Sequence, residues 1–483
     1  MRYFLPKLND IIFLSLLTSV LLMGPKTFNL DGDLGRHITI GYYILDNMSI
    51  PTKDVFSHTL YGEPLTPHEW LSQLVFAVAH KMLSLSGTVL VIAVLIGGTF
   101  SIIYWDSRQR SNTPLLTLIL TILAATASSI HWLARPHIFT FLFLAIWAYF
   151  LEQIQRDRKI PIWIFGILMV LWANTHGAFI AGFVVLGAYT VGHYVDAVLS
   201  KQQVEITKML TWIKIVGVSV IATFLNPSGI HLWQTSLGYI GNSYLVNHTV
   251  EYQAVDFHIL GFCPFLLMIL LSMLVLSFKH QRISSAHALL ITGWTIMGLY
   301  SARNIPLYAI IFTPIIAEII STNFRCLHWL VVEKKIMMIE DSVTGFIWPI
   351  VGIFCTFILL NTKAMQAYNT FNPSVFPVEA INWLDENPQE GPVFNYFTWG
   401  GYLLYREWPN QLVFIDGQTD FYGEILTREY EKVISLDEGW ESVLEKYEIS
   451  WALVEVNSPL AKTLADHGWT TQYKDGTAII LKK

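Results

Sequence analysis

Acidic side chains and histidines gather in one polar stretch near the start of a strongly apolar chain. Residues 31–70 read DGDLGRHITIGYYILDNMSIPTKDVFSHTLYGEPLTPHEW, and they follow a single short apolar run. A carboxylate held by its neighbours at a membrane surface can act as a general base and take the proton of an attacking hydroxyl group. Asp31 and Asp33 stand on either side of Gly32 and are the two candidates for that base. The alternative is a connecting loop that is polar and carries no chemistry.

Other side chains of the same stretch could bind a polar substrate. The candidates are Arg36, His37, Asp54, His68 and Glu69. Glu69 precedes a helical pattern, so its charge could instead stabilise the positive end of that helix. His37, His68 and Glu69 could hold a metal ion, but their spacing fits no compact ligand motif. We therefore assign no metal ligand and no certain cofactor, and a divalent cation stays open as the alternative.

Two arginines occur where one apolar run ends and the next begins. Arg135 and His137 flank Pro136, and Arg303 is followed by Asn304. An arginine at the end of a membrane span must be paired or bound to an anion, because an isolated charge is costly in a medium of low dielectric constant. Its planar fork suits a phosphate or diphosphate group. The alternative is a structural ion pair with Asp31 or Asp33.

Two further segments carry weaker signals for substrate binding. The string WANTHG predicts a tight turn between spans, in which Asn174 and His176 could bind a sugar or phosphate or could cap a helix end. Glu251 and Asp256 lie in the longest later loop and are candidate sugar contacts. All of these candidates need a framework that brings distant segments of the chain together.

The composition indicates that this framework is a membrane protein. The chain has 483 residues, of which 53% are hydrophobic and 14% are charged, whereas soluble domains have about 25% charged residues. The sequence shows no basic patch of the kind that binds nucleic acid, so a nucleic acid is not expected as partner. Hydropathy predicts about eleven spans. They lie near 8–25, 87–105, 114–131, 136–151, 160–174, 178–195, 209–225, 260–277, 287–302, 305–320 and 346–361.

The run 67–86 decides the orientation of all later spans. Its apolar residues have helical spacing but Glu69, Gln73, His80 and Lys81 interrupt it, which predicts an amphipathic helix at the membrane interface. With the N-terminus in the cytoplasm, the inner loops then carry the basic residues, as the positive-inside rule requires. These are Arg2, Lys7, Arg108, Arg110, Arg156, Arg158, Lys159, Lys201, Lys208, Lys279, Arg282, Arg325, Lys334 and Lys335. The same orientation places the polar motifs together on the outer face.

After about residue 370 the composition changes to that of a soluble domain. Short apolar runs near 392–395, 411–415, 450–455 and 477–481 predict strands, which alternate with helical patterns near 377–386, 424–434, 438–447 and 458–466. The string DGQTDFYG (416–423) resembles a cation loop, but its ladder of oxygen ligands is incomplete, which favours a turn. We predict a polytopic α-helical membrane domain over 1–365, with an outer loop and interfacial helix at 26–86, and an extracytoplasmic α/β domain over 370–483.

The order of these segments resembles the C-type (GT-C) membrane glycosyltransferases. Within them it is similar to the bacterial branch related to protein mannosyltransferases and to the RgtA/B/C/D-like domain. The matching strings are DGDLGRHITIG, IPTKDVFSHT, HEWLSQ, ARPH, WANTHG, NPSG, ARNIPLYAI, VFNYFTWGGYLLY and VFIDGQTDFY, and they span most of the chain. The resemblance implies a bacterial inner-membrane enzyme that performs an inverting transfer from a polyprenyl-phosphate sugar. It assigns the base to Asp33, with Asp31 as the close rival.

The sequence therefore predicts transfer of a sugar from a polyprenyl-phosphate donor, on the outer leaflet, to an acceptor that is a glycan, a lipid or a protein. Arg135 and Arg303 would stabilise the charge of the leaving phosphate. A transporter is disfavoured because the spans carry little central charge, with Lys214 as the main exception. A non-catalytic membrane subunit, whose outer domain docks a partner, is the second alternative.

Overall fold

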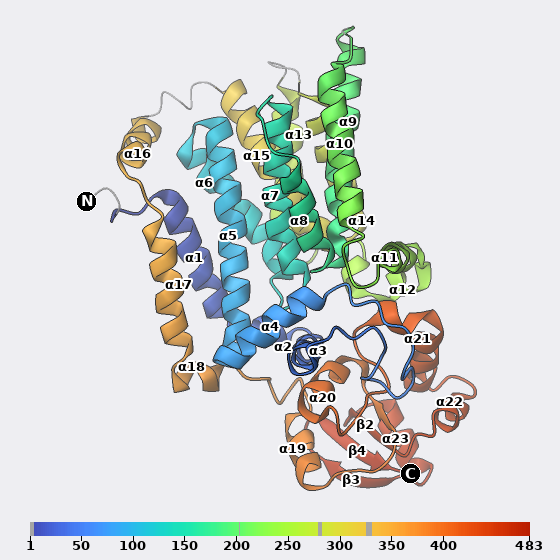
Figure 1. Cartoon of the computed structure of the whole chain (residues 1–483). Coiled ribbons are helices and arrows are strands. Elements are labelled where there is room, and N and C mark those ends of the chain that lie inside the picture. The colour runs from blue at the N-terminus through green and yellow to red at the C-terminus, as the bar shows by residue number, and fades with distance from the viewer. Residues whose placement is uncertain (1–3, 202, 279–282, 325–330) are drawn as a thin grey trace.

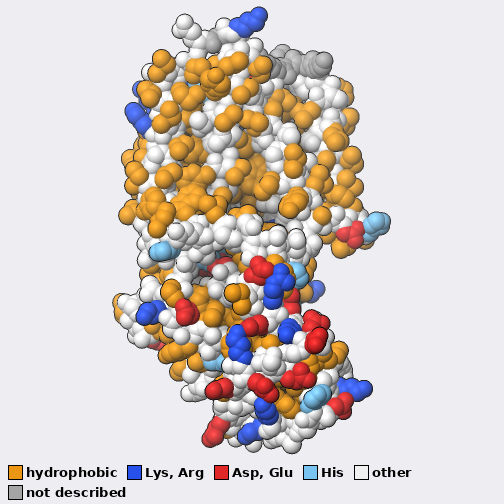
Figure 2. Space-filling model, turned by 90° about the vertical axis from the view of Figure 1, so that its right-hand side faces the viewer, with side chains coloured by type: hydrophobic (Ala, Val, Ile, Leu, Met, Phe, Trp, Pro, Cys, Tyr) orange, Lys and Arg blue, Asp and Glu red, His pale blue; other side chains and the backbone are white. Residues whose placement is uncertain are grey.

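The computed structural model describes residues 4–201, 203–278, 283–324 and 331–483, and it consists of a helical bundle with a smaller domain at one end (Figure 1). Of the basic residues assigned to inner loops, Arg2, Lys279, Arg282 and Arg325 lie outside the described residues. Figure 2 shows hydrophobic side chains spread over the flank of the bundle, whereas charged side chains concentrate on the C-terminal domain. This is the surface of a membrane protein with one polar end.

The apolar helices of the bundle coincide with the ranges that hydropathy predicts. They are α1 (Leu8–Met23), α5 (Leu85–Ser111), α6 (Pro114–Ser128), α7 (His137–Gln155), α8 (Trp163–Ala173), α9 (Ile180–Leu199), α10 (Ile206–Ala222), α13 (Cys263–Ser277), α14 (Ser285–Tyr300), α15 (Ile305–Asn323) and α17 (Ile347–Leu360). Among the described residues six helices are long and apolar enough to cross a membrane. A seventh qualifies if α16 (Val331–Ser342) and α17, bent by 78°, form one span. The figure of eleven spans stays a prediction.

The helix α15 lies at the centre of the bundle, and α13 lies at its rim. In its most apolar window α15 is 83% buried, whereas the corresponding window of α13 is 28% buried. The basic segments that follow α5, α7 and α9 lie at the end of the bundle away from the C-terminal domain (Figure 1). Short elements complete the helical part: α2 (Lys26–Asn29), α11 (His231–Gly241), α12 (Ser243–His248), α18 (Lys363–Tyr368) and the turns η1 (Ser129–His131), η2 (Gly177–Phe179), η3 (Val250–Tyr252), η4 (Leu260–Phe262) and η5 (Ala302–Asn304).

The polar stretch 31–70 contains a helix that the interpretation as a loop missed. This helix, α3 (Leu34–Asn47), lies between the bundle and the C-terminal domain (Figure 1). Its residues from Leu34 to Gly41 are all buried, including Arg36 and His37. The end of the helix is less covered, since Asp46 and Asn47 are exposed. The buried polar groups of α3 are available to build a site.

The run 67–86 forms α4 (Trp70–Leu83), which lies across the end of the bundle rather than along it (Figure 1). Fourteen helical residues span about 21 Å, less than the roughly 30 Å of a bilayer core. The chain turns at Ser84, whose φ is +52°, and α5 begins at Leu85. The buried face of α4 carries Gln73 and Phe76, while Val78 and Met82 are 41% and 60% exposed. This is the form expected of an interfacial helix.

The C-terminal domain contains a four-stranded sheet in the order β1-β2-β4-β3. The strands are β1 (Val393–Asn395), β2 (Trp451–Glu455), β3 (Thr470–Lys474) and β4 (Ala478–Lys482); β1 and β2 are parallel, and β4 is antiparallel to both of its neighbours. The helices are α19 (Val378–Glu386), α20 (Gly400–Glu407), α21 (Thr419–Ser435), α22 (Trp440–Lys446) and α23 (Pro459–Asp466), with the turn η7 (Phe397–Trp399) before α20.

Three elements of this domain differ from the prediction. The predicted strand 411–415 forms only an isolated bridge, in which Val413 pairs with Ser57 of the outer segment. That pairing ties the outer segment to the domain without adding a strand to the sheet. The sequence missed β3, because its side chains TTQYK are largely exposed and show no apolar alternation. The helix α20 was also missed, since its sequence begins with two glycines.

Those glycines let α3 and α20 approach each other closely. A β-carbon at Gly35 would overlap the carbonyl group of Gly401, and a β-carbon at Gly401 would overlap that of Gly32. Only glycine permits such backbone contact. The strings DGDLG and WGGY, which are 367 residues apart at Gly32 and Trp399, therefore form one docking surface. It fixes the C-terminal domain against the segment that carries Asp31 and Asp33.

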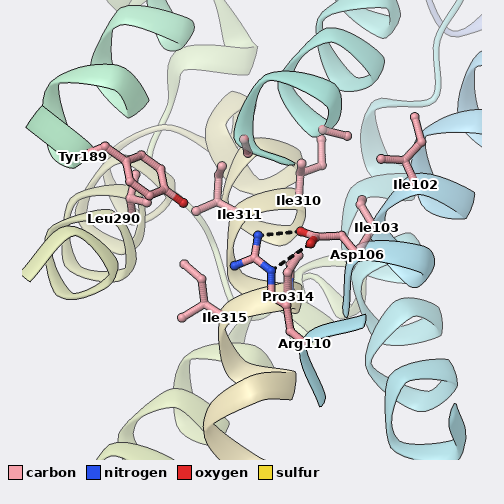
Figure 3. A pocket seen from close by; sticks show the side chains of 12 residues that line it. Ile102, Ile103, Asp106, Arg110, Tyr189, Leu290, Ile310, Ile311, Pro314 and Ile315 are labelled. Atoms are coloured by element: carbon pink, nitrogen blue, oxygen red, sulfur yellow. Dashed lines mark hydrogen bonds and ion pairs between the residues drawn. The ribbon is translucent and has the colours of Figure 1, made fainter. Parts of the chain in front are cut away.

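A group of buried ionisable side chains lies at the opposite end of the bundle; we call it the far-end group. Arg110 donates two hydrogen bonds to Asp106, at 2.9 and 2.6 Å (Figure 3). Glu152 accepts from Tyr189 at 2.8 Å, lies 2.8 Å from the ring of His287, and pairs with Arg110 at 3.4 Å. These charges lie near the ends of α5 and α7, beyond the predicted spans 87–105 and 136–151, so they do not contradict the expectation that the spans carry little central charge.

Candidate active site between the bundle and the C-terminal domain

One arginine gathers three carboxylates where the bundle meets the C-terminal domain; we call these four side chains the junction group. Arg135 donates to Asp31 through Nε and through Nη2, the latter at 2.6 Å. Its guanidinium also pairs with Asp33 at 2.8 Å and with Glu251 at 2.7 Å. The structure thus brings together the two candidate bases and the arginine predicted to face a phosphate. The members come from the segment between α2 and α3, the segment between η1 and α7, and η3.

The junction group has more negative than positive charge. Burial raises the pKa of Asp31 to about 6, because Arg135 offsets only part of the loss of solvation. Burial would also raise the pKa of Glu251, but the neighbouring Arg135 and Arg303 outweigh it and hold that pKa at about 2. The side chain of Arg135 is still 26% exposed, whereas that of Asp31 is 2% exposed. An anion that approached Arg135 would compete with carboxylates already in contact with it.

Arg303 extends the junction group toward the centre of the bundle. It donates to the hydroxyl of Tyr252 at 2.8 Å and lies 4.0 Å from Glu251. Its Nη2 lies 3.4 Å from Nε2 of His176, whose Nδ1 is 2.9 Å from the hydroxyl of Thr140. Because arginine can only donate, His176 accepts at Nε2 and carries its proton on Nδ1. Burial and Arg303 both lower the pKa of His176 well below its ordinary value, which keeps the ring neutral.

Arg36 forms the centre of a second polar group on the side of the C-terminal domain. Its Nη1 donates to Oε1 of Gln418 at 2.8 Å, and its Nε lies 3.6 Å from Asp416. Its Nη2 lies 3.7 Å from Glu69. Burial raises the pKa of Asp416 to about 6 and also raises the pKa of Glu69. These acids therefore keep protons to higher pH than exposed carboxylates do.

The two histidines of the outer segment contact Glu69 from opposite sides. His68 lies 3.8 Å from Glu69 and 3.7 Å from Asp420, and His37 lies 3.9 Å from Glu69. Burial, followed by the charge of Arg36, lowers the pKa of His37 well below its ordinary value. Among the described residues no group of three His, Cys, Asp or Glu side chains is arranged to hold a metal ion. The polar atoms here suit hydroxyl groups as hydrogen-bond partners.

Five predicted site residues lie apart from the two arginine groups. One of them, Asp256, is exposed and hydrogen-bonded to His258. Asp54 accepts hydrogen bonds from Phe56 and Ser57 of its own turn, and Asn304 donates to the carbonyl of Met297. Asn174 accepts from the indole of Trp70 at 2.7 Å and donates to two backbone carbonyls, so it fixes the start of α4. His137 is bound to the carbonyl of His131 at 2.8 Å, with its ring centroid 6.4 Å from that of His176.

Comparison with known proteins gives a match in structure rather than in sequence. No family model matches the chain, and no curated protein matches it significantly. The archaeal oligosaccharyltransferase AglB from Archaeoglobus fulgidus, solved with an inhibitory peptide and a dolichol-phosphate, aligns with a TM-score of 0.61 and 11% identity over 98% of this chain and 74% of that chain. The chain has the fold of the C-type membrane glycosyltransferases.

ArnT from Cupriavidus metallidurans shows the same fold over nearly its whole length. Its structure bound to undecaprenyl phosphate aligns with a TM-score of 0.53 and 12% identity, over 96% of this chain and 97% of that chain. Its structure in the apo state aligns with a TM-score of 0.55 and 12% identity, over 98% and 97% of the two chains. The fold predicted from the resemblance is confirmed, and it extends through the C-terminal domain.

Several residues of this region were not assigned to a site from the sequence. Asp416 and Gln418 belong to the string DGQTDFYG, which was interpreted as a turn, and a turn it is: Asp416 accepts from the backbone N–H of Gln418 at 2.8 Å just before α21. Its acidic residues were the signal, but nothing in the string shows that Arg36 faces it. Tyr252 follows Glu251 directly and gives no signal of its own.

Proposed function

We propose that this chain is a membrane glycosyltransferase that moves a sugar from a polyprenyl-phosphate donor to an acceptor hydroxyl group on the outer face of the membrane. The observation that carries the proposal is the meeting of Asp33, Arg135 and Arg303 where the apolar helices give way to the polar domain. The structures with this fold hold dolichol-phosphate in AglB and undecaprenyl phosphate in ArnT. A similar lipid beside this bundle would bring its phosphate to the two arginines.

The reaction needs one base and one stabilised leaving group. Asp33 takes the proton of the acceptor hydroxyl as its oxygen bonds to the anomeric carbon of the sugar. The bond from that carbon to the phosphate oxygen breaks, its electron pair stays on the lipid phosphate, and the configuration of the sugar inverts. Arg135 and Arg303 stabilise the charge that develops on the phosphate.

Asp33 suits the role of base better than Asp31. Asp31 makes two hydrogen bonds to Arg135 and its side chain is 2% exposed. Asp33 makes one close contact with that guanidinium and is 12% exposed. A base must reach the proton that it removes, and it must not be bound through both oxygens to a cation. Asp31 is better placed to orient Arg135.

The arrangement at the two ends of the bundle supports an outward-facing site. Several of the basic residues assigned to inner loops lie in the last turn of α5 or follow α7 and α9, at the end away from the C-terminal domain (Figure 1). With those residues in the cytoplasm, the N-terminus is cytoplasmic and residues 370–483 form an extracytoplasmic domain. The acceptor then reaches the site from the side of that domain.

The test uses the full-length chain in lipid nanodiscs and in bacterial membranes. Asp33→Asn is expected to lower transfer of labelled sugar from the polyprenyl-phosphate lipids of the membrane by roughly a hundredfold or more, with binding of undecaprenyl phosphate retained. Arg135→Met and Arg303→Met are each expected to weaken that binding roughly tenfold. Asp385→Asn and Arg406→Met, which break a pair of 2.7 Å elsewhere in the C-terminal domain, serve as matched controls.

The outcomes separate the proposal from its main rival. If Asp31→Asn and Asp33→Asn both keep full transfer activity, neither acid is the base. If the wild-type chain binds no undecaprenyl phosphate and transfers no sugar, the chain is a membrane subunit whose outer domain docks a partner.

A further inference from the structure

The C-terminal domain touches the candidate base through a segment of five residues, 416–420. Gly417 lies directly against the carboxylate of Asp33, and a β-carbon at Gly417 would overlap that carboxylate. The neighbouring Asp416 is held firmly: it accepts from the backbone of Gln418 at 2.8 Å and from the hydroxyl of Tyr422 at 3.2 Å. The segment therefore presents a fixed carboxylate beside Asp33 rather than a mobile loop.

Arg36 could form an ion pair either with this segment or with Asp33. It follows Asp33 by three residues at the start of α3, and side chains three positions apart on a helix can pair. In the described part of the chain its ion pairs are instead with Asp416 and Glu69, and it donates to Gln418. Its Nε is buried without a hydrogen bond. That Nε is the atom that faces Asp416, at 3.6 Å, so Asp416 attracts the guanidinium by charge without a hydrogen bond to it.

We propose that Asp416 is a positioning residue that, with Gln418, draws Arg36 toward the C-terminal domain and keeps it off Asp33. Asp33 already contacts Arg135 at 2.8 Å. If Arg36 turned to it as well, Asp33 would lie between two guanidinium groups and would be a poor proton acceptor. The C-terminal domain is then part of the transfer site, and the inference rests on the proposed role of Asp33 as base.

A simpler role for the segment is to dock the domain on the bundle. In that case loss of Asp416 would lower the stability of the chain by the same amount whether or not Asp33 is also changed. The proposed role differs, because Arg36 would exchange Asp416 for Asp33. The two roles are therefore separated by whether changes at Asp416 and Asp33 act independently.

The first experiment is a double-variant cycle, read as the midpoint of thermal unfolding of the full-length chain in nanodiscs. In Asp416→Asn alone, Arg36 pairs with Asp33, which limits the loss. In Asp416→Asn with Asp33→Asn, Arg36 keeps its hydrogen bond to Gln418 but Glu69 is its only remaining close carboxylate, so the midpoint is expected to fall by roughly 2 °C or more beyond the sum of the single changes. Asp385→Asn replaces Asp416→Asn in the control cycle, which is expected to be additive. In an Arg36→Met background the excess is expected to vanish.

The second experiment measures binding of undecaprenyl phosphate to the same nanodiscs. Asp416→Asn removes one negative charge near the phosphate and draws Asp33 away from Arg135, so binding is expected to become tighter by roughly threefold. Asp416→Glu keeps the charge and is expected to bind as the wild type does. A variant that merely loosened the domain would bind more weakly.

Additive unfolding midpoints in the Asp416–Asp33 cycle would overturn the inference, and so would weaker lipid binding by Asp416→Asn. The cycle does not depend on the reaction. Excess loss in the cycle, combined with no binding of undecaprenyl phosphate by the wild type, would support the arrangement of Arg36 and overturn the proposed function instead.

Discussion

The bundle holds an arginine among carboxylates at each end, and the two groups are built differently. In the far-end group the pairs among Asp106, Arg110 and Glu152 lie within the final turns of two long helices, and Arg110 is 5% exposed. In the junction group the members come from helix ends and short connecting segments, and Arg135 is 26% exposed. Arginine and carboxylate side chains thus lie within long helices at the far end, and on helix ends and short connecting segments at the junction.

The charges of the two groups differ as well. In the far-end group Glu152 faces both Arg110 and Arg156 and lies 2.8 Å from the ring of His287. In the junction group three carboxylates share Arg135. A cavity of about 10 Å³ beside Arg110 is lined mainly by apolar side chains, five of them isoleucines (Figure 3), and has room for about one water molecule. The far-end group therefore joins helices, whereas the junction group has more negative than positive charge and a more exposed arginine.

The largest expected difference between the two ends concerns their arginines. Arg110→Met leaves Asp106 and Glu152 buried near each other, and we expect it to lower the free energy of unfolding by about 3–5 kcal/mol. Arg135→Met leaves Asp33 and Glu251 partly exposed, and the buried Asp31, whose pKa is already about 6, can take up a proton, so the expected loss is smaller, about 1–3 kcal/mol. Thermal unfolding of the two variants in the same detergent measures both values. Equal losses would remove the distinction between a structural group and a site.

The pH dependence of stability sharpens the comparison further. The pKa of Asp31 rises from its ordinary 3.8 to about 6, so between these values the folded chain holds a proton that the unfolded chain has lost. Stability is therefore expected to fall as pH rises from about 4 to about 6, by up to roughly 2 kcal/mol. Glu251, whose pKa falls from 4.5 to about 2, acts with the opposite sign at lower pH, where stability rises with pH.

Asp31→Asn tests this dependence, because it is expected to flatten the fall between pH 4 and 6. Asp416, whose pKa is also raised to about 6, keeps part of the slope in that variant. Unfolding midpoints of the wild type and the variant across this pH range give the measurement. An unchanged slope in Asp31→Asn would contradict the assignment of the raised pKa to Asp31.

Hydropathy and the resemblance predicted most of the bundle because burial in a lipid leaves a strong pattern. Each apolar range became a helix, and the pairing of Asp31 with Arg135 was one of the two alternatives drawn from the sequence. The helix α3 escaped because its polar residues, among them Arg36 and His37, were interpreted as part of a loop although they are buried. Hydropathy does not show that a polar side chain is buried among other polar groups.

The contacts of the C-terminal domain could not be predicted from the sequence in the same way. Arg36 and Gln418 are hydrogen-bonded although they are 382 residues apart, and no local pattern in either segment records the other. The glycines that permit the approach are visible in DGDLG and WGGY, yet a glycine indicates close packing without naming the partner. The contact between α3 and the turn before α21 forms only when the two domains dock.

The smallest expected effects come from one matched change at each end, tyrosine to phenylalanine. Tyr189 donates to Glu152 at 2.8 Å among buried groups, and Tyr189→Phe is expected to cost about 1–2 kcal/mol of stability because a buried carboxylate loses a donor. Tyr252 accepts from the partly exposed Arg303, and its ring also lies 5.0 Å from that guanidinium. Tyr252→Phe keeps the ring contact, so the expected cost is about 0.5 kcal/mol or less. Binding of undecaprenyl phosphate to Tyr252→Phe should not weaken, since the change frees a donor of Arg303 for an anion. A larger cost at Tyr252 than at Tyr189, measured by thermal unfolding, would mean that the junction group holds the fold together as firmly as the far-end group does.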